Sequence, residues 1–312
     1  MAAVVRNTGP RIVVVGSLNV DSTYHVDALP RPGETIRVKA VSTTRGGKGA
    51  NQAVAAARAG GAVSIVGCVG NDAPGAAYRA ALEHEGIATD LTRTVDDATG
   101  AAVIALDERG GNMILVHPGA NGRVASEDVV RAAGRIREAE ILLIQLEVPL
   151  AALREAVSLA RSAGVRVILN PSPWLPELRD DPLPVDAMIV NEHEASLLTG
   201  RTEDELVHAR EGVISALPAD LLVVTRGAAG SLTLSRSGEC VNVDAFPVTP
   251  VDTVGAGDAF AGALAVALGE GRPLVEAIRF ANAAGALATL QVGAQAATPS
   301  RTEIEALLRK QT

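Results

Sequence analysis

Ile141-Leu142-Leu143-Ile144 opens a unit that sets the fold class, because a helical segment over Leu150–Ala163 and a second apolar run over Val165–Leu169 follow it. Outward from this unit, similar runs recur at four places: Ile12–Val15, Val63–Val66, Ala187–Val190 and Leu221–Val224. Runs that are apolar nearly throughout are typical of strands buried on both faces. Their alternation with helices predicts an α/β fold with a mostly parallel central sheet and helices on both sides.

Two segments break this alternation. Residues 21–44 contain Pro30, Pro32 and Gly33 but no long helical stretch. Two strand-like runs, 101–106 and 112–116, flank turn-forming residues and predict a hairpin. Together the segments, approximately 21–45 and 99–118, are expected to form a small β-sheet on a single domain spanning residues 1–312. Such a flap either closes over a substrate as a lid or is a hairpin without function, and we favour the lid.

Composition excludes several classes of function. Lys plus Arg is 28 and Asp plus Glu is 36, which gives a net charge of −8, and aromatic residues make up only 2% of the 312 residues. A chain without a basic stripe or stacking platform is a poor nucleic-acid binder. Cys68 and Cys240 lack CxxC spacing, which favours reduced structural thiols over a disulfide or zinc site. With no secretion signal and no apolar run of membrane-spanning length, we expect a cytoplasmic protein that binds no membrane.

The strongest local signal is Asp252-Thr253-Val254-Gly255-Ala256-Gly257-Asp258, which precedes a helix-forming run. A glycine-rich turn that opens a helix is an anion site, because free N–H groups and the positive end of the helix dipole face the ligand. Small residues at 255–257 let the backbone approach a phosphate closely. The stretch is neither a Walker A loop nor a dinucleotide-binding fingerprint.

Asp258 falls in the first turn of that expected helix. A lone Asp at a helix start is most often an N-terminal cap. Here two carboxylates and three small residues form one tight unit, which is more than a cap requires. We therefore expect Asp258 to act as the base that takes a proton from an attacking hydroxyl, while the N–H groups of Gly255, Ala256 and Gly257 stabilise the moving phosphoryl group.

A second motif, Arg45-Gly46-Gly47-Lys48-Gly49-Ala50-Asn51-Gln52, precedes a helix expected at Ala53–Ala59. Adjacent glycines let the chain press against a ligand, while Lys48 supplies a cation and Asn51 an amide that both donates and accepts. This mixture suits a polyol. A flexible loop with a helix starting at Asn51 explains the same residues equally well.

The two motifs together, at 46–53 and 252–258, resemble those of the PfkB family of carbohydrate kinases. Further matches lie at 16–21, 32–35, 117–121 and 145–147, and the similarity runs in the same order from about Arg11 to near the C-terminus. The resemblance implies a ribokinase-like, three-layer α/β/α domain with a β-sheet lid.

The resemblance also implies a sugar pocket. Its expected lining consists of carboxylates, amides, a lysine and a glycine that hydrogen-bond vicinal hydroxyls, with Asp258 against the phosphorylated one: Asn19, Asp21, Gly47, Lys48, Asn51 and Glu147. Taken singly, Asn19 and Asp21 are equally compatible with a β-turn, and Glu147 with a charge at a strand end.

Asn191-Glu192-His193-Glu194 resembles the family motif that helps place Mg²⁺ and phosphate, with Glu194 acting through water, although a capped helix start explains it as well. The nucleotide site implied by the resemblance comprises Asn191, Thr225, Arg226, Gly227, Ala228, Ala229, Gly230, Gly257 and Asn282. Without the resemblance, residues 225–230 are a hairpin turn and Asn282 is a polar residue on a helix face.

A potassium ion is also implied as a monovalent activator. The matching positions donate mostly backbone carbonyls and are Asp252, Val254, Ala288, Gln291, Gly293 and Ala297. Ala297 stands where the family often has Ser, so one hydroxyl donor is missing.

The resulting hypothesis is an ATP-dependent sugar kinase that transfers the γ-phosphate of ATP directly to the 5-hydroxyl of D-ribose, with Mg²⁺ bridging the phosphates. Same-family alternatives are 2-deoxyribose, fructose or a nucleoside, although one Trp, two Tyr and three Phe offer little to stack a base. A non-catalytic sugar sensor would not need Asp258 and its glycine turn. The resemblance further suggests a homodimer that covers the exposed edge of the lid.

Overall fold

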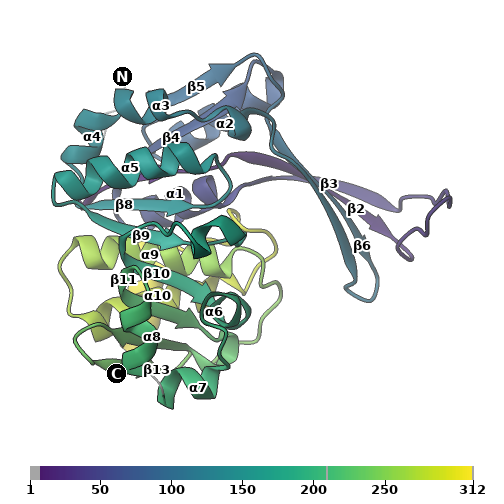
Figure 1. Cartoon of the computed structure of the whole chain (residues 1–312). Coiled ribbons are helices and arrows are strands. Elements are labelled where there is room, and N and C mark those ends of the chain that lie inside the picture. Colours follow the sequence, from purple (N-terminus) through teal and green to yellow (C-terminus); the bar gives the residue numbers. More distant parts are fainter. Residues whose placement is uncertain (1–7, 209, 311–312) are drawn as a thin grey trace.

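The computed structural model describes residues 8–208 and 210–310, which form a nine-stranded sheet between two layers of helices (Figure 1). All sheet pairings are parallel except the two at one edge, β11–β12 and β12–β13. In spatial order the strands are β13 (Cys240–Val243), β12 (Ser231–Ser235), β11 (Ala219–Thr225), β10 (Val185–Asn191), β9 (Arg166–Asn170), β8 (Ile141–Gln145), β1 (Arg11–Val15), β4 (Ala62–Gly70) and β5 (Thr92–Val95).

Each face of this sheet buries its own apolar core. Successive residues of β1 divide between the cores, Ile12 and Val14 on one side and Val13 and Val15 on the other, as the alternation of strand side chains requires. Helices of the first core are α1 (Lys48–Arg58), α2 (Ala73–His84), α9 (Ala256–Gly269), α10 (Leu274–Ala288) and α11 (Arg301–Lys310). Helices of the second are α3 (Ser126–Arg131), α4 (Ala133–Arg137), α5 (Leu150–Ser162), α6 (Glu192–Thr199), α7 (Glu203–His208) and α8 (Arg210–Ala216). The predicted three-layer α/β/α fold is confirmed.

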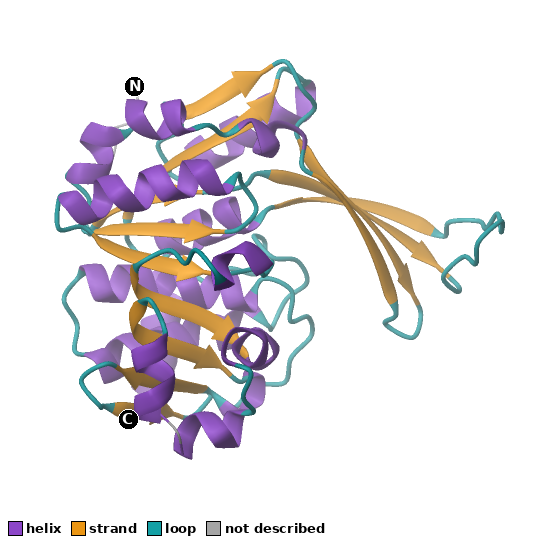
Figure 2. Ribbon diagram, in the orientation of Figure 1, coloured by secondary structure: helices purple, strands orange, loops and turns teal. Residues whose placement is uncertain are grey.

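A second sheet extends from this body like an arm (Figure 2). We call it the projecting sheet; its order is β3 (Ala40–Gly46), β2 (Asn19–Val26), β6 (Gly100–Asp107) and β7 (Asn112–His117). Strands β6 and β7 form the predicted antiparallel hairpin, and β2 joins the two segments by pairing in parallel with β6. The two segments that interrupt the βα alternation therefore do form one small sheet.

Helix α1 begins earlier than expected, at Lys48 rather than near Ala53. Glycines are poor helix formers, which is why the sequence favoured a loop here. In the structure, a Cβ on Gly49 would lie 2.4 Å from the backbone nitrogen of Ser17, so this glycine lets α1 touch the turn after β1. Tertiary packing therefore outweighs the low helix propensity of glycine. Gly49 allows two backbone segments to touch, and this contact explains the glycine without a ligand.

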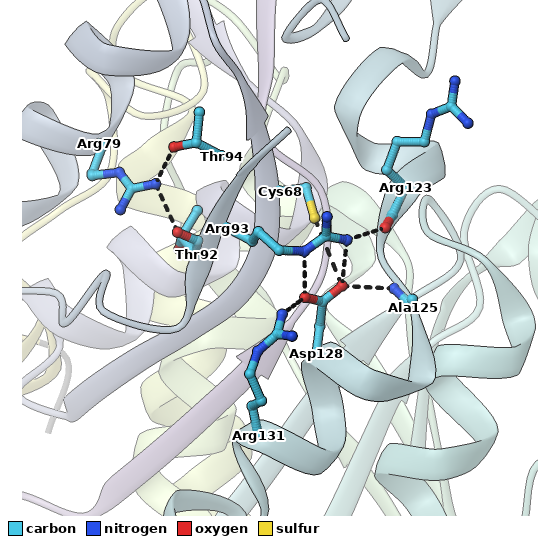
Figure 3. Close-up of polar contacts among 9 residues, drawn as sticks. All are labelled: Cys68, Arg79, Thr92, Arg93, Thr94, Arg123, Ala125, Asp128 and Arg131. Atoms are coloured by element: carbon cyan, nitrogen blue, oxygen red, sulfur yellow. Dashed lines mark hydrogen bonds and ion pairs between the residues drawn. The ribbon is translucent and has the colours of Figure 1, made fainter. Parts of the chain in front are cut away.

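A buried carboxylate braces the outer edge of the fold (Figure 3). Asp128 of α3 is 2% exposed and accepts hydrogen bonds from Arg93 of β5 at 2.7 and 2.9 Å, from Arg131, and from the Ala125 backbone at 2.9 Å. Burial alone would raise the pKa of Asp128, but these hydrogen bonds and the arginine charges hold that pKa below its usual range. Asp128 therefore stays ionised and ties α3 to the sheet.

Both cysteines are free thiols, as predicted. Burial and the charge of Asp128 raise the pKa of Cys68 to about 11, so this thiol stays protonated and unreactive. Within residues 8–208 and 210–310, no helix has both the length and the apolar character needed to cross a bilayer. The cytoplasmic location stays a prediction.

Candidate active site

The motif at 252–258 forms the N-terminus of α9 at the carboxyl edge of the central sheet. Gly255 is the N-cap residue with φ +80°, and a Cβ there would meet the Ala294 Cα at 2.6 Å, so only glycine is accommodated. Gly257 instead faces open space, because a Cβ placed on it meets no atom within 4 Å. The N–H groups of Gly257 and Asp258 lie in the first turn and have no acceptor within the helix. This end of α9 has the features of an anion site.

Asp258 is held by two side-chain amides of α1. Its Oδ2 accepts from Asn51 Nδ2 at 3.0 Å and its Oδ1 accepts from Gln52 Nε2 at 2.9 Å, and the residue is only 8% exposed. The carboxylate therefore contacts a neighbouring helix rather than capping its own. Two donors fix the plane of the carboxylate while leaving lone pairs for an incoming hydroxyl.

The residues that support Asp258 from behind were missed by the sequence analysis. Gln52 Nε2 also donates to Asn170 Oδ1 at 3.0 Å, and Gln52 Oε1 accepts from Gln145 Nε2 at 2.6 Å. These amides come from α1 and from the ends of β8 and β9. The one available signal was the adjacent polar pair Asn51-Gln52 in a segment otherwise rich in alanine.

The predicted sugar residues lie in β2 and around the start of α1. Asn19 and Asp21 belong to an eight-residue strand, so the β-turn interpretation of them is wrong. Asn121 Nδ2 donates to Asn19 Oδ1 at 2.6 Å, which leaves the Asn19 amino group as the donor for a ligand. Glu147 accepts from the Lys48 backbone at 2.9 Å and from the Ser17 hydroxyl, and so connects β8 to α1.

Asp21 is a buried acceptor in need of a partner. Its Oδ1 is buried without a hydrogen bond. Burial, with the nearby charge of Glu147, raises the pKa of Asp21 to about 6, although the Ala102 backbone N–H opposes the shift. A Cβ on Gly46 would lie 1.9 Å from Asp21 Oδ2, so this glycine makes room for the carboxylate. An unsatisfied buried carboxylate is costly unless a ligand supplies donors.

Lys48 places a positive charge among the acidic groups. Burial acts to lower the pKa of Lys48, but the carboxylates of Asp258, Glu147 and Glu194 outweigh it and raise that pKa overall. The ammonium group is therefore protonated at neutral pH. A fixed cation beside the end of α9 complements a phosphate.

A cavity of about 370 Å³ opens on the other side of the α9 N-terminus. Six of the predicted nucleotide residues line it: Thr225, Gly227, Ala228, Gly230, Gly257 and Asn282. Its remaining wall is largely apolar and includes Ala245, Phe246, Pro247, Val248 and Pro250. This wall was not predicted, because isolated apolar residues in a connecting segment carry no periodic signal.

Three predicted nucleotide residues lie outside that lining. Asn191 caps α6, since its Oδ1 accepts from Glu194 N at 2.8 Å while Glu194 Oε2 accepts from Asn191 N at 3.0 Å. The guanidinium of Arg226 donates to the Ala229 carbonyl at 2.9 Å and to Asn242. The capped helix start is therefore present, and the roles of Asn191, Glu194, Arg226 and Ala229 toward a ligand stay predictions.

Part of the predicted cation loop is brought together. Asp252 Oδ1 accepts from Val254 N at 3.0 Å, and Asp252 Oδ2 accepts from Gly293 N at 2.9 Å. The Gly293 carbonyl also accepts from Ala297 N at 3.0 Å. Among the described residues, no cluster of three or more His, Cys, Asp or Glu side chains is arranged to hold a metal. A carbonyl-lined monovalent site is compatible with this loop but stays a prediction.

A glycine-lined helix end with a buried carboxylate, beside a largely apolar cavity and a group of polar side chains, defines a phosphoryl-transfer site of the sugar-kinase type. The family model for pfkB carbohydrate kinases matches residues 10–301, and the chain belongs to this family. Its relatives include the ribokinase of Bacillus subtilis, 39% identical over 95% of this chain and 99% of the relative. They also include the deoxyribokinase of Salmonella typhi, 36% identical over 93% and 95%. The structure of Arabidopsis thaliana ribokinase complexed with ribose and ATP aligns with a TM-score of 0.86 at 33% identity, covering 97% of this chain and 99% of that one.

Proposed function

We propose that this chain is an ATP-dependent ribokinase that phosphorylates the 5-hydroxyl of D-ribose. The observation that carries the proposal is the buried Asp258 carboxylate at the N-terminus of α9, with a nucleotide-sized cavity on one side and the Asn19, Asp21 and Lys48 group on the other. The family and the ribokinase relatives support the same activity.

In this mechanism Asp258 accepts the proton of the 5-hydroxyl as that oxygen attacks the γ-phosphorus. The new O–P bond forms as the bond between the γ-phosphorus and the β,γ-bridging oxygen breaks, and ADP leaves with the bonding electrons. The first-turn N–H groups of α9 and the Lys48 ammonium stabilise the transferring phosphoryl oxygens. Asn51 and Gln52 keep the base aimed during the transfer.

Two cations complete the proposal. The donor set suits a hydrated Mg²⁺ that arrives with ATP, since the described residues offer single carboxylates such as Glu194 rather than a protein cage. When bound, Mg²⁺ neutralises phosphate charge. The loop joined by Asp252 and Gly293 is the proposed K⁺ site, with Val254, Ala288, Gln291 and Ala297 as the remaining predicted contributors.

A coupled ADP-release assay tests the proposal. Purified protein is supplied with MgATP and, in turn, D-ribose, 2-deoxy-D-ribose, D-fructose or adenosine, each with KCl or with NaCl at equal ionic strength. We expect the highest kcat/KM with D-ribose and higher activity in KCl. The deoxyribokinase relative makes 2-deoxyribose the second candidate. A higher kcat/KM for any other acceptor would overturn the ribose assignment, and activity with none of them would overturn the kinase assignment.

Asp21→Asn is expected to raise the thermal stability of the ligand-free protein and to weaken ribose binding. Because the folded pKa of Asp21 is raised to about 6 from 3.8, the folded state holds more protons than the unfolded state between these values, and the contribution of Asp21 to stability declines as pH rises through this window. We expect the variant to have a higher ligand-free Tm than wild type at pH 7.5, with the difference shrinking by pH 4.5. Its ribose KM should rise, because a charge-assisted hydrogen bond is lost. A lower Tm at pH 7.5 together with an unchanged KM would contradict both expectations.

We also propose that the projecting sheet is the lid and that it pairs two chains. Large apolar side chains are exposed on both faces of this sheet: Val41, Val103, Met113 and Leu115 on one face, and Ile114 and Val116 on the other. So many exposed apolar side chains on one small sheet are unusual in a monomer and would be covered by the same sheet of a second copy. Sedimentation velocity is expected to give the mass of a dimer, and Leu115→Lys should shift it toward the monomer. A monomeric wild type contradicts the proposal.

A further inference from the structure

A chain of hydrogen bonds reaches Asp258 through Asn51. Gln295, in the loop after α10, donates from Nε2 to Asn51 Oδ1 at 3.0 Å and to the Tyr78 hydroxyl at 2.6 Å. Tyr78 of α2 in turn donates to the Gly46 carbonyl. All these side chains are buried: Tyr78 is 1% exposed, Asn51 7% and Gln295 8%. Asn51 then donates to Asp258.

The donors and acceptors in this series of hydrogen bonds allow only one direction of donation. The Gln295 amino group has two hydrogens, and Asn51 Oδ1 and the Tyr78 oxygen accept one each. The single hydroxyl hydrogen of Tyr78 is donated to Gly46, so its oxygen is left to accept. Because Asn51 Oδ1 is occupied by Gln295, the Asn51 amino group must face Asp258. A flipped Asn51 would set its carbonyl oxygen against the Asp258 carboxylate, acceptor against acceptor, and its amino group against the Gln295 amino group, donor against donor.

We propose that Gln295, supported by Tyr78, is a positioning residue that fixes the orientation of the Asn51 amide and thereby keeps one hydrogen-bond donor on the catalytic carboxylate. This inference rests on the proposed role of Asp258 as the base. Gln295 touches neither the base nor the lining of the nucleotide cavity, and it acts only through Asn51.

The test must leave the charged side chains near Asp258 unchanged. Lys48 of α1 interacts with the charge of Asp258 and also with the charges of Glu147 after β8 and Glu194 of α6. Substitution of Gln295 leaves these three side chains in place but removes the hydrogen bond to Tyr78, a loss that Tyr78→Phe reproduces while it keeps the bond to Asn51. A change in the acidic limb of the rate profile that an uncharged substitution of Gln295 produces then reports on the donor that Asn51 supplies.

The experiment compares Gln295→Met and Gln295→Glu with wild type in kcat–pH profiles at saturating D-ribose, MgATP and KCl. Neither variant keeps the donor to Asn51 at neutral pH, so Asn51 is free to turn away from Asp258. We expect kcat at pH 7.5 to fall about tenfold and the acidic limb to move up by about one pH unit, the effect of one lost hydrogen bond to a carboxylate. Asn71→Asp, the same amide-to-acid change at an exposed site, is the matched control and should leave the profile in place.

Tyr78→Phe supplies a milder variant, because it removes one acceptor of Gln295 and keeps the other. We expect a smaller shift of the same acidic limb. A lower Tm with the limb unmoved in both Gln295 variants would show that Gln295 is merely structural and would overturn the inference. Absence of sugar phosphorylation by wild type would instead overturn the proposed function, so the two failures are distinguishable.

Discussion

Asp258→Asn is expected to lower kcat for ribose phosphorylation by at least about 100-fold, since a positioned general base contributes about 10²–10⁴. Asparagine keeps the size of the side chain but cannot take the proton of the attacking hydroxyl. Sugar binding should survive, because Asn19, Asp21 and Glu147 are untouched and the variant amide still accepts one hydrogen bond from α1. The measurements are kcat by ADP release and ribose affinity by isothermal titration calorimetry.

The loss must be separated from damage to the fold. In the variant, residue 258 keeps only one of its two hydrogen bonds to α1. Its new amino group faces either Asn51 Nδ2 or Gln52 Nε2, and both of these are donors. We therefore expect a modest fall in Tm but a folded protein at assay temperature. Asp220→Asn, which lies 66% exposed in an ion pair with Arg236, is the control and should retain wild-type kcat. Turnover of Asp258→Asn within a few fold of wild type would refute the assignment of the base.

The central sheet could be predicted because its strands carry their own signal. The apolar runs at 141–144 and 187–190 match β8 and β10, since a strand buried on both faces must be apolar along its length. Strand β2 carries no such signal. Its sequence, from Asn19 to Val26, mixes polar residues with Val20, Tyr24 and Val26 and has no continuous apolar run, so its pairing with β3 and β6 is what defines the strand.

The candidate site was predictable only in part for a related reason. Asp258 and Lys48 lie in motifs whose glycines and charges are adjacent in the sequence. Gln295 and Tyr78 are single residues 217 positions apart, and no spacing rule links them. Their function exists only once α2, α1 and the loop after α10 pack together, so a tertiary structure was needed to find them.

Asp128 gives the largest stability prediction outside the site. Asp128→Ala is expected to lower the free energy of unfolding by about 3 kcal/mol, the low end for breaking a buried ion pair, because the arginine partners are partly exposed and regain water. Arg93 is 37% and Arg131 56% exposed at the side chain, whereas Asp128 is 1%. The change also removes the acceptor for Ala125 N at the start of α3, a cap contribution of about 1 kcal/mol that is included in this total.

A second pair on the same edge of the fold provides the matched control. Asp90 pairs with Arg135 at 3.0 Å but is 59% exposed, so Asp90→Ala should cost no more than about 1 kcal/mol. Both variants are measured by urea unfolding, with kcat as a check that the distant active site is intact. Because the folded pKa of Asp128 is depressed, its contribution is present above the unfolded pKa and is lost as pH falls through the folded value. The difference in unfolding free energy between the two variants should therefore become smaller at acidic pH. Equal losses of unfolding free energy at pH 7 would show that the burial of Asp128 does not strengthen its ion pairs.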